Sequence, residues 1–221
     1  ADIWSTVNRE IADLYDKRFN GRPKVVTNAG KFWDLEPHTV LSENIKLVHH
    51  GVLNPTRKLE EMIRLMDLLD NRFTLDLFLI GSDQEYLKKL KSKSNKSKVR
   101  FLPPVKYDEI VPILNKYDIG LFILQEDVTS YKYALPNKLF EFIQGRLAVA
   151  ISPNISMKRL VDEFGVGIVG DDFTAESLAV KLNKLTISDI DEMKIRSNFA
   201  ATKLNDTDGV RVIKQLISSL N

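Results

Sequence analysis

From residue 45 onward, short apolar runs alternate with amphipathic segments along the chain. The runs are "IKLVHH", "LDLFLIG", "KVRFL", "IGLFIL" and "LAVAIS", and a further one, "VGIVG", precedes helical stretches near residues 174–185, 189–204 and 208–220. Nearly continuous apolar runs are typical of strands that helices cover on both faces of a parallel sheet. The sequence therefore predicts an α/β fold with a doubly wound, Rossmann-like parallel sheet over residues 45–221.

Residues 1–44 have a different pattern. An amphipathic helix, "STVNREIADLYDKRF", is followed by a turn at "NGRP", a short strand "KVVT" and a polar connector. One helix and one strand bury too little apolar surface to fold alone. We expect this segment to be the tail of a preceding domain, with a linker at about residues 29–44, so that a whole N-terminal domain is missing here.

The composition excludes several kinds of site. With 43% hydrophobic and 28% charged residues and a net charge of +2, the chain offers no overall attraction for nucleic acid or membranes. It has no cysteine, which rules out disulfides and thiolate zinc sites, and only three histidines, so we expect no metal site. No apolar run approaches the roughly 20 residues that span a bilayer. We expect a cytoplasmic protein that needs no metal or other cofactor.

The segment "ALPNKLFEFIQGRLAVA" predicts a helix over residues 136–144, with a proline suited to its first turn. Asn137, Lys138 and Glu141 share the face opposite the apolar side chains. A lysine there faces the positive end of the helix dipole, which a bound phosphate would compensate. Glu141 could accept hydrogen bonds from two vicinal hydroxyls, such as those of a ribose. The alternative is an exposed ion pair between Lys138 and Glu141, and the spacing leaves both open.

The segment "HHGVLNPTRK", residues 49–58, has the pattern of a strand end, a polar turn and a helix start. In doubly wound folds, ligands lie at the carboxyl ends of the strands. Gly51 would let the backbone approach a phosphate, and Arg57 or Lys58 could clamp it. The alternative is a plain connecting loop with basic residues on a helix surface. His49 and His50, which precede this glycine, could contact a substrate, although a histidine at a strand end is more often packed or solvated.

Two further segments carry weaker signals. The segment "KKLKSKSNKSKVR", residues 88–100, holds seven basic residues but no interleaved aromatics, so we expect a solvated surface and no nucleic-acid site. A weak contact with anionic lipid headgroups stays open. The segment "FLPPVKYDEI", residues 101–110, forms a rigid proline loop whose backbone could read the edge of a base. Rigidity for its own sake explains that loop equally well.

Taken together, these motifs resemble one family. "PNKLFEFIQGRLAVA" closely resembles the "PNKLFEY" signature, followed by a "G-x-P-V" strand, of family 4 glycosyltransferases with the GT-B fold. "HHGVLNPTRKLEEMI", "LFLIGSDQEYLKKL" and "VRFLPPVKYDEI" are similar to other units of the same C-terminal, nucleotide-sugar-binding domain, in the same order. This resemblance covers about residues 45–170. "TVNREIADLYDKRFNGRPKVVTNAG" resembles the last helix and strand of the N-terminal, acceptor-binding domain.

The resemblance implies roles for individual residues. Glu141 matches the glutamate that holds the ribose of the donor. The helix start over the diphosphate is matched by Asn137, Lys138 and Leu139. The phosphate-binding loop is matched by Gly51, Arg57 and Lys58. The loop that borders the base is matched by the segment that includes Phe101, Leu102, Pro103 and Val105. Family members are retaining enzymes that transfer a sugar from a nucleotide donor and need no metal to hold the diphosphate.

The chain departs from the family pattern at Tyr133, where many members have a second glutamate near the donor sugar. We expect the donor-binding part of a retaining hexosyltransferase, which transfers a sugar from a nucleotide-diphosphate sugar to a glycan or lipid-linked acceptor in polysaccharide or glycoconjugate synthesis. This part alone should be inactive, and contact with the inner face of the membrane is left open. The alternatives are a non-catalytic binding or scaffold module with the same fold and a nucleotide-sugar 2-epimerase, which would need acid–base groups around the sugar.

Overall fold

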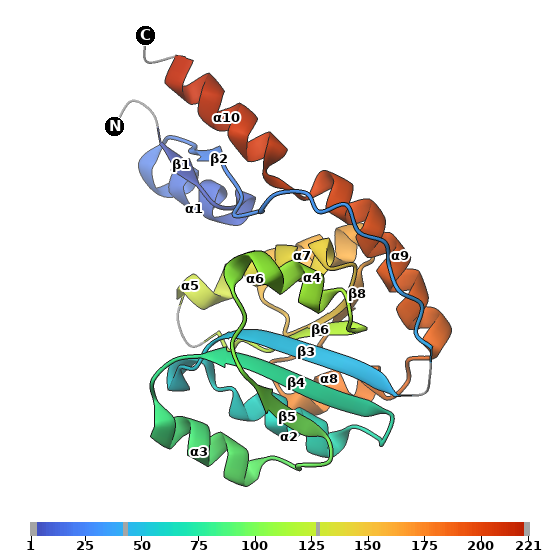
Figure 1. The fold of residues 1–221 in the computed structure, drawn as a ribbon. Helices are drawn as coiled ribbons and strands as arrows, with labels where there is room; N and C mark the ends of the chain where they lie inside the picture. Colours follow the sequence, from blue (N-terminus) through green and yellow to red (C-terminus); the bar gives the residue numbers. More distant parts are fainter. Residues whose placement is uncertain (1–3, 42–43, 127–128, 219–221) are drawn as a thin grey trace.

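The computed structural model describes residues 4–41, 44–126 and 129–218. Its centre is a six-stranded parallel sheet with the strand order β5-β4-β3-β6-β7-β8 (Figure 1). The strands are β3 (Ile45–Val52), β4 (Phe73–Ile80), β5 (Val99–Leu102), β6 (Ile119–Phe122), β7 (Ala148–Ile151) and β8 (Gly167–Val169). The order reverses between β3 and β6, as in a doubly wound fold, so the predicted fold class is confirmed.

Helices cover both faces of the sheet (Figure 1). One layer contains α2 (Glu60–Leu68), α3 (Gln84–Lys93) and α8 (Ala175–Leu182). The other contains α4 (Ile110–Leu114), α6 (Asn137–Gln144), α7 (Ile155–Phe164) and α9 (Ile187–Lys203). Short helical turns lie at η1 (Pro55–Arg57), η2 (Tyr107–Glu109) and α5 (Thr129–Lys132). Every residue of β6 and β7 is buried, which explains why those strands are almost wholly apolar.

The N-terminal segment contains the predicted helix and strand, but with different bounds and with an additional short strand. Helix α1 (Arg9–Phe19) begins later than expected, because Asn8 accepts a hydrogen bond from the Ile11 amide and so caps it. The residues before the cap form a short strand, β1 (Ser5–Thr6), which pairs with β2 (Lys24–Val25). Helix α10 (Asp206–Ser218) packs on β2 and extends away from the main sheet (Figure 1). Residues 219 and 220, the predicted end of this helix, lie outside the described residues.

The described part of the connector between β2 and β3 has no regular secondary structure, but side chains from the domain hold it. Gln144 accepts a hydrogen bond from the Trp33 amide, and Arg146 donates one to the Trp33 carbonyl. The Asn115 side chain donates to the Glu36 carbonyl in the same way. The connector is therefore fixed against α6 and α4. Within the described residues, every helix is too short or too polar to span a bilayer.

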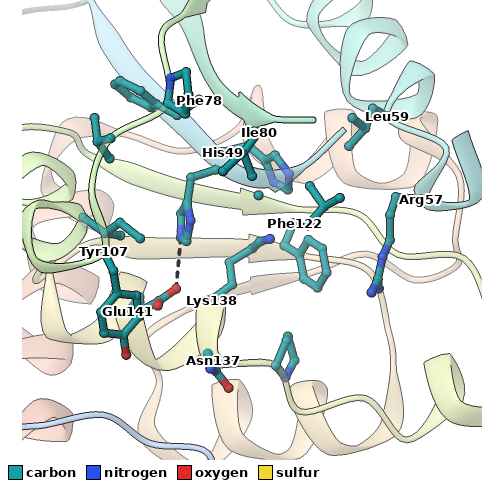
Figure 2. A pocket seen from close by; sticks show the side chains of 17 residues that line it. His49, Arg57, Leu59, Phe78, Ile80, Tyr107, Phe122, Asn137, Lys138 and Glu141 are labelled. Carbon is teal, nitrogen blue, oxygen red and sulfur yellow. Dashed lines mark ion pairs between the residues drawn. The ribbon is translucent and has the colours of Figure 1, made fainter. Parts of the chain in front are cut away.

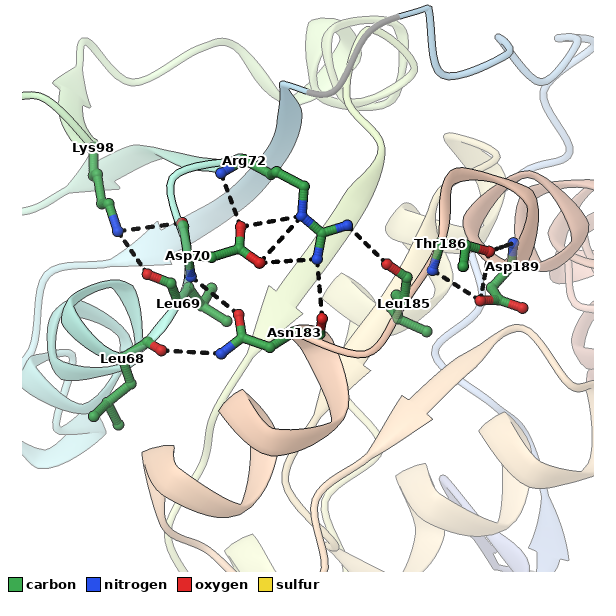
Figure 3. A network of polar contacts seen from close by, with 9 residues as sticks. All are labelled: Leu68, Leu69, Asp70, Arg72, Lys98, Asn183, Leu185, Thr186 and Asp189. Atoms are coloured by element: carbon green, nitrogen blue, oxygen red, sulfur yellow. Dashed lines mark hydrogen bonds and ion pairs between the residues drawn. The ribbon is translucent and has the colours of Figure 1, made fainter.

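A polar network joins the link between α8 and α9 to the turn before β4 (Figure 3). The Arg72 guanidinium lies against the Asp70 carboxylate and donates to the carbonyls of Leu185 (2.9 Å) and Asn183 (3.0 Å). The Asn183 side chain accepts from the Asp70 amide and donates to the Leu68 carbonyl. These bonds satisfy four backbone groups, and they hold the turn before β4 against the link between α8 and α9.

Candidate functional site

A cavity of about 590 Å³ opens at the carboxyl ends of β3 and β6, where the strand order reverses (Figure 2). This is the position at which doubly wound sheets bind ligands, because the crossovers diverge there and leave a crevice. The cavity is lined by His49, His50, Gly51, Val52, Arg57, Leu59, Phe78, Ile80, Pro104, Val105, Tyr107, Ile110, Phe122, Pro136, Asn137, Lys138 and Glu141. One end is polar and mostly basic, and the other is apolar.

Gly51 is the second-last residue of β3, so it does not lie in the following loop, and it has a φ of +147°. Side chains rarely adopt this backbone conformation, so a glycine fits here. The missing side chain also leaves room for Lys138, because a β-carbon at position 51 would lie 2.5 Å from the lysine Nζ. The ammonium group of Lys138 therefore rests directly over Gly51. The approach of the Gly51 backbone to a phosphate stays a prediction.

Lys138 reaches from the first turn of α6 into the basic end of the cavity (Figure 2). Its Nζ lies 4.8 Å from the centre of the Phe122 ring, a cation–π contact. Burial lowers the pKa of this lysine to about 8, and the nearby Arg57 adds to the effect while Glu141 opposes it. No ion pair or hydrogen bond engages Nζ within the part of the chain that the structure describes. A partly buried cation of this kind favours an anionic ligand.

Arg57 also lines the cavity, from the end of η1. Its guanidinium stacks 4.7 Å from the centre of the Tyr131 ring, which comes from α5 across the mouth. Lys58, its predicted companion, is exposed and does not line the cavity, because it closes η1 in a left-handed conformation with a φ of +47°. At this turn the Arg57 side chain therefore points into the cavity, and the Lys58 side chain points to solvent.

The start of α6 presents backbone N–H groups at the same end. The predicted start at residue 136 is one position too early, because Pro136 precedes the helix as its N-cap residue and supplies no capping side chain. The amides of Asn137 and Lys138 have no hydrogen-bond partner among the described residues. The Leu139 amide already donates to the Pro136 carbonyl, and the Leu139 side chain is buried in the core. Two free amides and a lysine therefore converge on the cavity.

Glu141 lies one turn further along α6, and its carboxylate contacts a histidine rather than Lys138. Glu141 Oε2 is 3.2 Å from His50 Nε2, the contact drawn dashed in Figure 2. Both side chains are largely buried, with 15% and 11% of their surfaces exposed. The exposed ion pair between Lys138 and Glu141, which the spacing had left open, is thus not what the structure contains.

The neighbouring His49 is held differently. Its Nδ1 lies 2.9 Å from the Leu121 carbonyl, to which it donates as an N–H, and its ring stacks on Phe122. Burial lowers the pKa of His49 well below its usual value, with Lys138 contributing, so the ring is neutral at pH 7. Nε2 is then an acceptor that faces the space over Gly51.

The apolar end of the cavity includes only part of the predicted base-bordering loop. Val105 lines it together with Pro104, whereas Phe101, Leu102 and Pro103 do not. The lining residues to which sequence reasoning assigned no role are Val52, Leu59, Phe78, Ile80, Tyr107, Ile110 and Phe122. Three of these lie at the ends of β4 and β6, so the rule that places ligands at strand ends, applied to every strand, would have found them.

The basic stretch over residues 88–100 lies away from this cavity, on α3 and the turn before β5. Four of its seven basic side chains contact the domain itself. They are Lys89 with Glu60, Lys91 over the Phe101 ring, Lys98 with the Leu69 carbonyl (Figure 3) and Arg100 with Asp76. No cluster of three potential metal-binding side chains occurs among the described residues.

Sheet order, layers and cavity position define a Rossmann-like domain of the GT-B glycosyltransferase type. Residues 34–202 match the family model described as "Glycosyl transferases group 1". Because the match covers more than half of the chain, the chain belongs to this family. No curated protein matches it by sequence.

Solved structures show the same fold at low sequence identity. A mutant of TarM from S. aureus, in complex with fondaparinux, alpha-GlcNAc-glycerol and UDP, is 13% identical with a TM-score of 0.78, over 96% of this chain and 43% of that one. Anabaena Alr3699/HepE, in complex with UDP and glucose, is 16% identical with a TM-score of 0.78, over 99% and 64%. The pneumococcal O-GlcNAc transferase GtfA, in complex with UDP and GlcNAc, is 12% identical with a TM-score of 0.73, over 99% and 45%. The chain thus spans 43 to 64% of these three structures.

Proposed function

We propose that this chain is the donor-binding part of a retaining glycosyltransferase that takes its sugar from a nucleoside-diphosphate sugar. The observation that carries the proposal is the convergence of Lys138, Arg57 and the free amides of α6 at one end of the cavity, with Glu141 one turn further on. A diphosphate brings the negative charge that the basic end lacks. A ribose brings the vicinal hydroxyls that a carboxylate accepts.

We propose that two cations and a helix N-terminus hold the diphosphate without a metal ion. The apolar end suits a nucleobase, since Phe78, Ile80 and Val105 provide flat apolar surface and the proline loop provides backbone groups. The structures of TarM, HepE and GtfA cited above contain UDP. We therefore propose UDP as the nucleotide part of the donor.

The same groups would assist catalysis. When the bond from the sugar to the diphosphate breaks, negative charge grows on the leaving phosphate oxygen, beside Lys138 and Arg57. Cations fixed in a partly buried site stabilise that charge more than water does. The rest of the rate enhancement would come from holding donor and acceptor in line. We assign no catalytic base to this chain.

The cavity favours this proposal over a nucleotide-sugar 2-epimerase. An epimerase needs acid–base groups around the sugar, and Glu141 is the only carboxylate among the described residues that line the cavity. A non-catalytic scaffold module would keep the fold, but it would have no need for a lysine without an ion-pair partner in the cavity. Nucleotide binding is therefore the property to measure first.

We propose that the acceptor binds outside the donor cavity. We propose that residues 1–44 belong to the acceptor-binding domain, with a glycan or a lipid-linked glycan as acceptor. Large apolar side chains on α1 and α10 support this assignment, because Phe19 and Ile217 keep 59% and 58% of their surface exposed.

Isothermal titration with UDP, ADP and GDP tests the proposal. We expect UDP to bind, and Glu141→Ala to weaken its binding by roughly 10- to 100-fold, as expected for hydrogen bonds to a charged group. Glu163→Ala is the matched control, because this exposed glutamate on α7 pairs only with Arg159 in the described chain. Absence of binding by any nucleotide to the folded protein would refute the proposal. Equal UDP affinity in both variants would refute only the role of Glu141.

A further inference from the structure

His50 and Glu141 meet at the inner wall of the cavity although they come from different elements. Their closest atoms, Nε2 and Oε2, are 3.2 Å apart, but the ring N–H is not aligned well enough for a regular hydrogen bond. Among the described residues, no other acceptor engages this buried nitrogen. Such contacts in a site without its ligand often tighten when the ligand binds.

The packing around His50 fixes where its ring lies. The ring meets Phe142 edge-on, with centroids 5.6 Å apart. Phe142 is fully buried and lies flat over Gly120 of β6, where a β-carbon would come within 2.3 Å of the ring. Gly120 therefore leaves room for the Phe142 ring. This ring supports His50 beside Glu141, the residue that precedes Phe142 on α6.

The charge state of His50 suits a donor to a carboxylate. Burial lowers its pKa and Glu141 opposes that effect, so the imidazole is neutral at pH 7. A neutral imidazole carries one N–H, and the carboxylate favours the form with that hydrogen on Nε2. The histidine can therefore bind Glu141 without neutralising it, which keeps the carboxylate available for hydroxyl groups.

Without this donor, Glu141 has a competing partner. Lys138 lies three residues earlier on the same helix, a spacing at which opposite charges pair. That pair would remove the lysine from the phosphate end and the carboxylate from the hydroxyl end. We propose that His50 is a positioning residue, which holds the Glu141 carboxylate away from Lys138 and turned toward the ribose hydroxyls of the donor. The inference rests on the proposed function.

The test compares the affinity of UDP with that of 2′,3′-dideoxy-UDP, since only UDP offers hydroxyls to Glu141. We expect the wild type to prefer UDP by roughly tenfold or more, the value of a hydrogen bond to a charged group. His50→Phe should reduce this preference to less than about threefold, as Glu141→Gln should, whereas His50→Gln should retain most of it because its amide donates from a similar position. His38→Phe, on the exposed connector, is the control that should change nothing.

A second measurement is made on the wild type, so it does not depend on whether His50→Phe folds. Nitrogen chemical shifts of ¹⁵N-labelled histidine, assigned with the His38→Phe variant and His50→Gln, should show the hydrogen of His50 on Nε2 in the UDP complex. The hydrogen on Nδ1, or a ribose preference that His50→Phe retains in full, would overturn the inference. A wild type that fails to bind UDP would instead overturn the proposed function.

Discussion

The ammonium group of Lys138 occupies the space that a side chain on Gly51 would need, with 2.5 Å between Nζ and the position of a β-carbon. Gly51→Ala should therefore push the lysine away from the basic end of the cavity. We expect the dissociation constant of UDP to rise by about tenfold or more, the effect of weakening one charge-assisted hydrogen bond. Isothermal titration on the folded variant would measure the change.

Gly81→Ala provides the matched control for this variant. Gly81 directly follows β4 and has a φ of +159°. A β-carbon at this position would lie 2.9 Å from the Leu53 side chain and would not approach a cation. Both variants should lose roughly 1–3 kcal/mol of unfolding free energy to backbone strain. If both also lose the same UDP affinity, the contact between Gly51 and Lys138 has no specific role.

Lys138→Met should remove the cation while keeping a long side chain against Phe122. We expect UDP affinity to fall by roughly 10- to 100-fold, since a charged hydrogen-bond donor is lost and the anion stays. The affinity for free uridine, which has no phosphate, should stay unchanged. Lys93→Met on the exposed basic stretch is the control. An equal loss for uridine and UDP would show that Lys138 acts through the fold and not through phosphate.

The sequence predicted the fold and the polar end of the cavity for a physical reason. Apolar runs buried on both faces indicate parallel strands, and parallel strands place their carboxyl ends at one edge. Gly51, Arg57 and Lys138 follow from that rule, because Gly51 lies near the carboxyl end of β3, Arg57 in the connection that follows this strand and Lys138 in the first turn of α6. The family model then confirmed the resemblance that joined these motifs, although the assignment to family 4 in particular stays a prediction.

The sequence did not predict which way neighbouring side chains of a loop would point. Arg57 faces the cavity and Lys58 does not, since the left-handed backbone at Lys58 changes the direction of the chain. The partner of Glu141 was also unpredictable, because helical spacing identifies only neighbours on the same helix, and His50 comes from a strand. The late start of α1 follows from the cap at Asn8, a residue type that favours this position and could have been recognised.

The affinity for UDP should depend on pH through Lys138. Its pKa is about 8 in the free protein, lowered first by burial. A bound diphosphate favours the charged form and raises that pKa, so affinity is complete below about pH 8 and falls as the pH rises above it, by at most about tenfold per pH unit. Titrations between about pH 7.5 and 10 suit the test, since a terminal phosphate with a pKa near 6 is already ionised there. Lys138→Met should show no such decline, and a flat wild-type profile would contradict the assignment.

Arg72 should matter for stability and not for the ligand. Its guanidinium satisfies the carbonyls of Leu185 and Asn183 and lies against Asp70 (Figure 3). Arg72 directly precedes β4, whereas the cavity lies at the carboxyl ends of the strands. Arg72→Met leaves the two carbonyls without their side-chain donor and the carboxylate with only the backbone amide of residue 72, so we expect the free energy of unfolding to fall by roughly 2–4 kcal/mol in urea denaturation. Arg211→Met is the control, because its pair with Asp208 is exposed and should contribute less than about 1 kcal/mol. Equal losses in the two variants would show that the network does not fix these turns, whereas UDP affinity under native conditions should stay at the wild-type value in both.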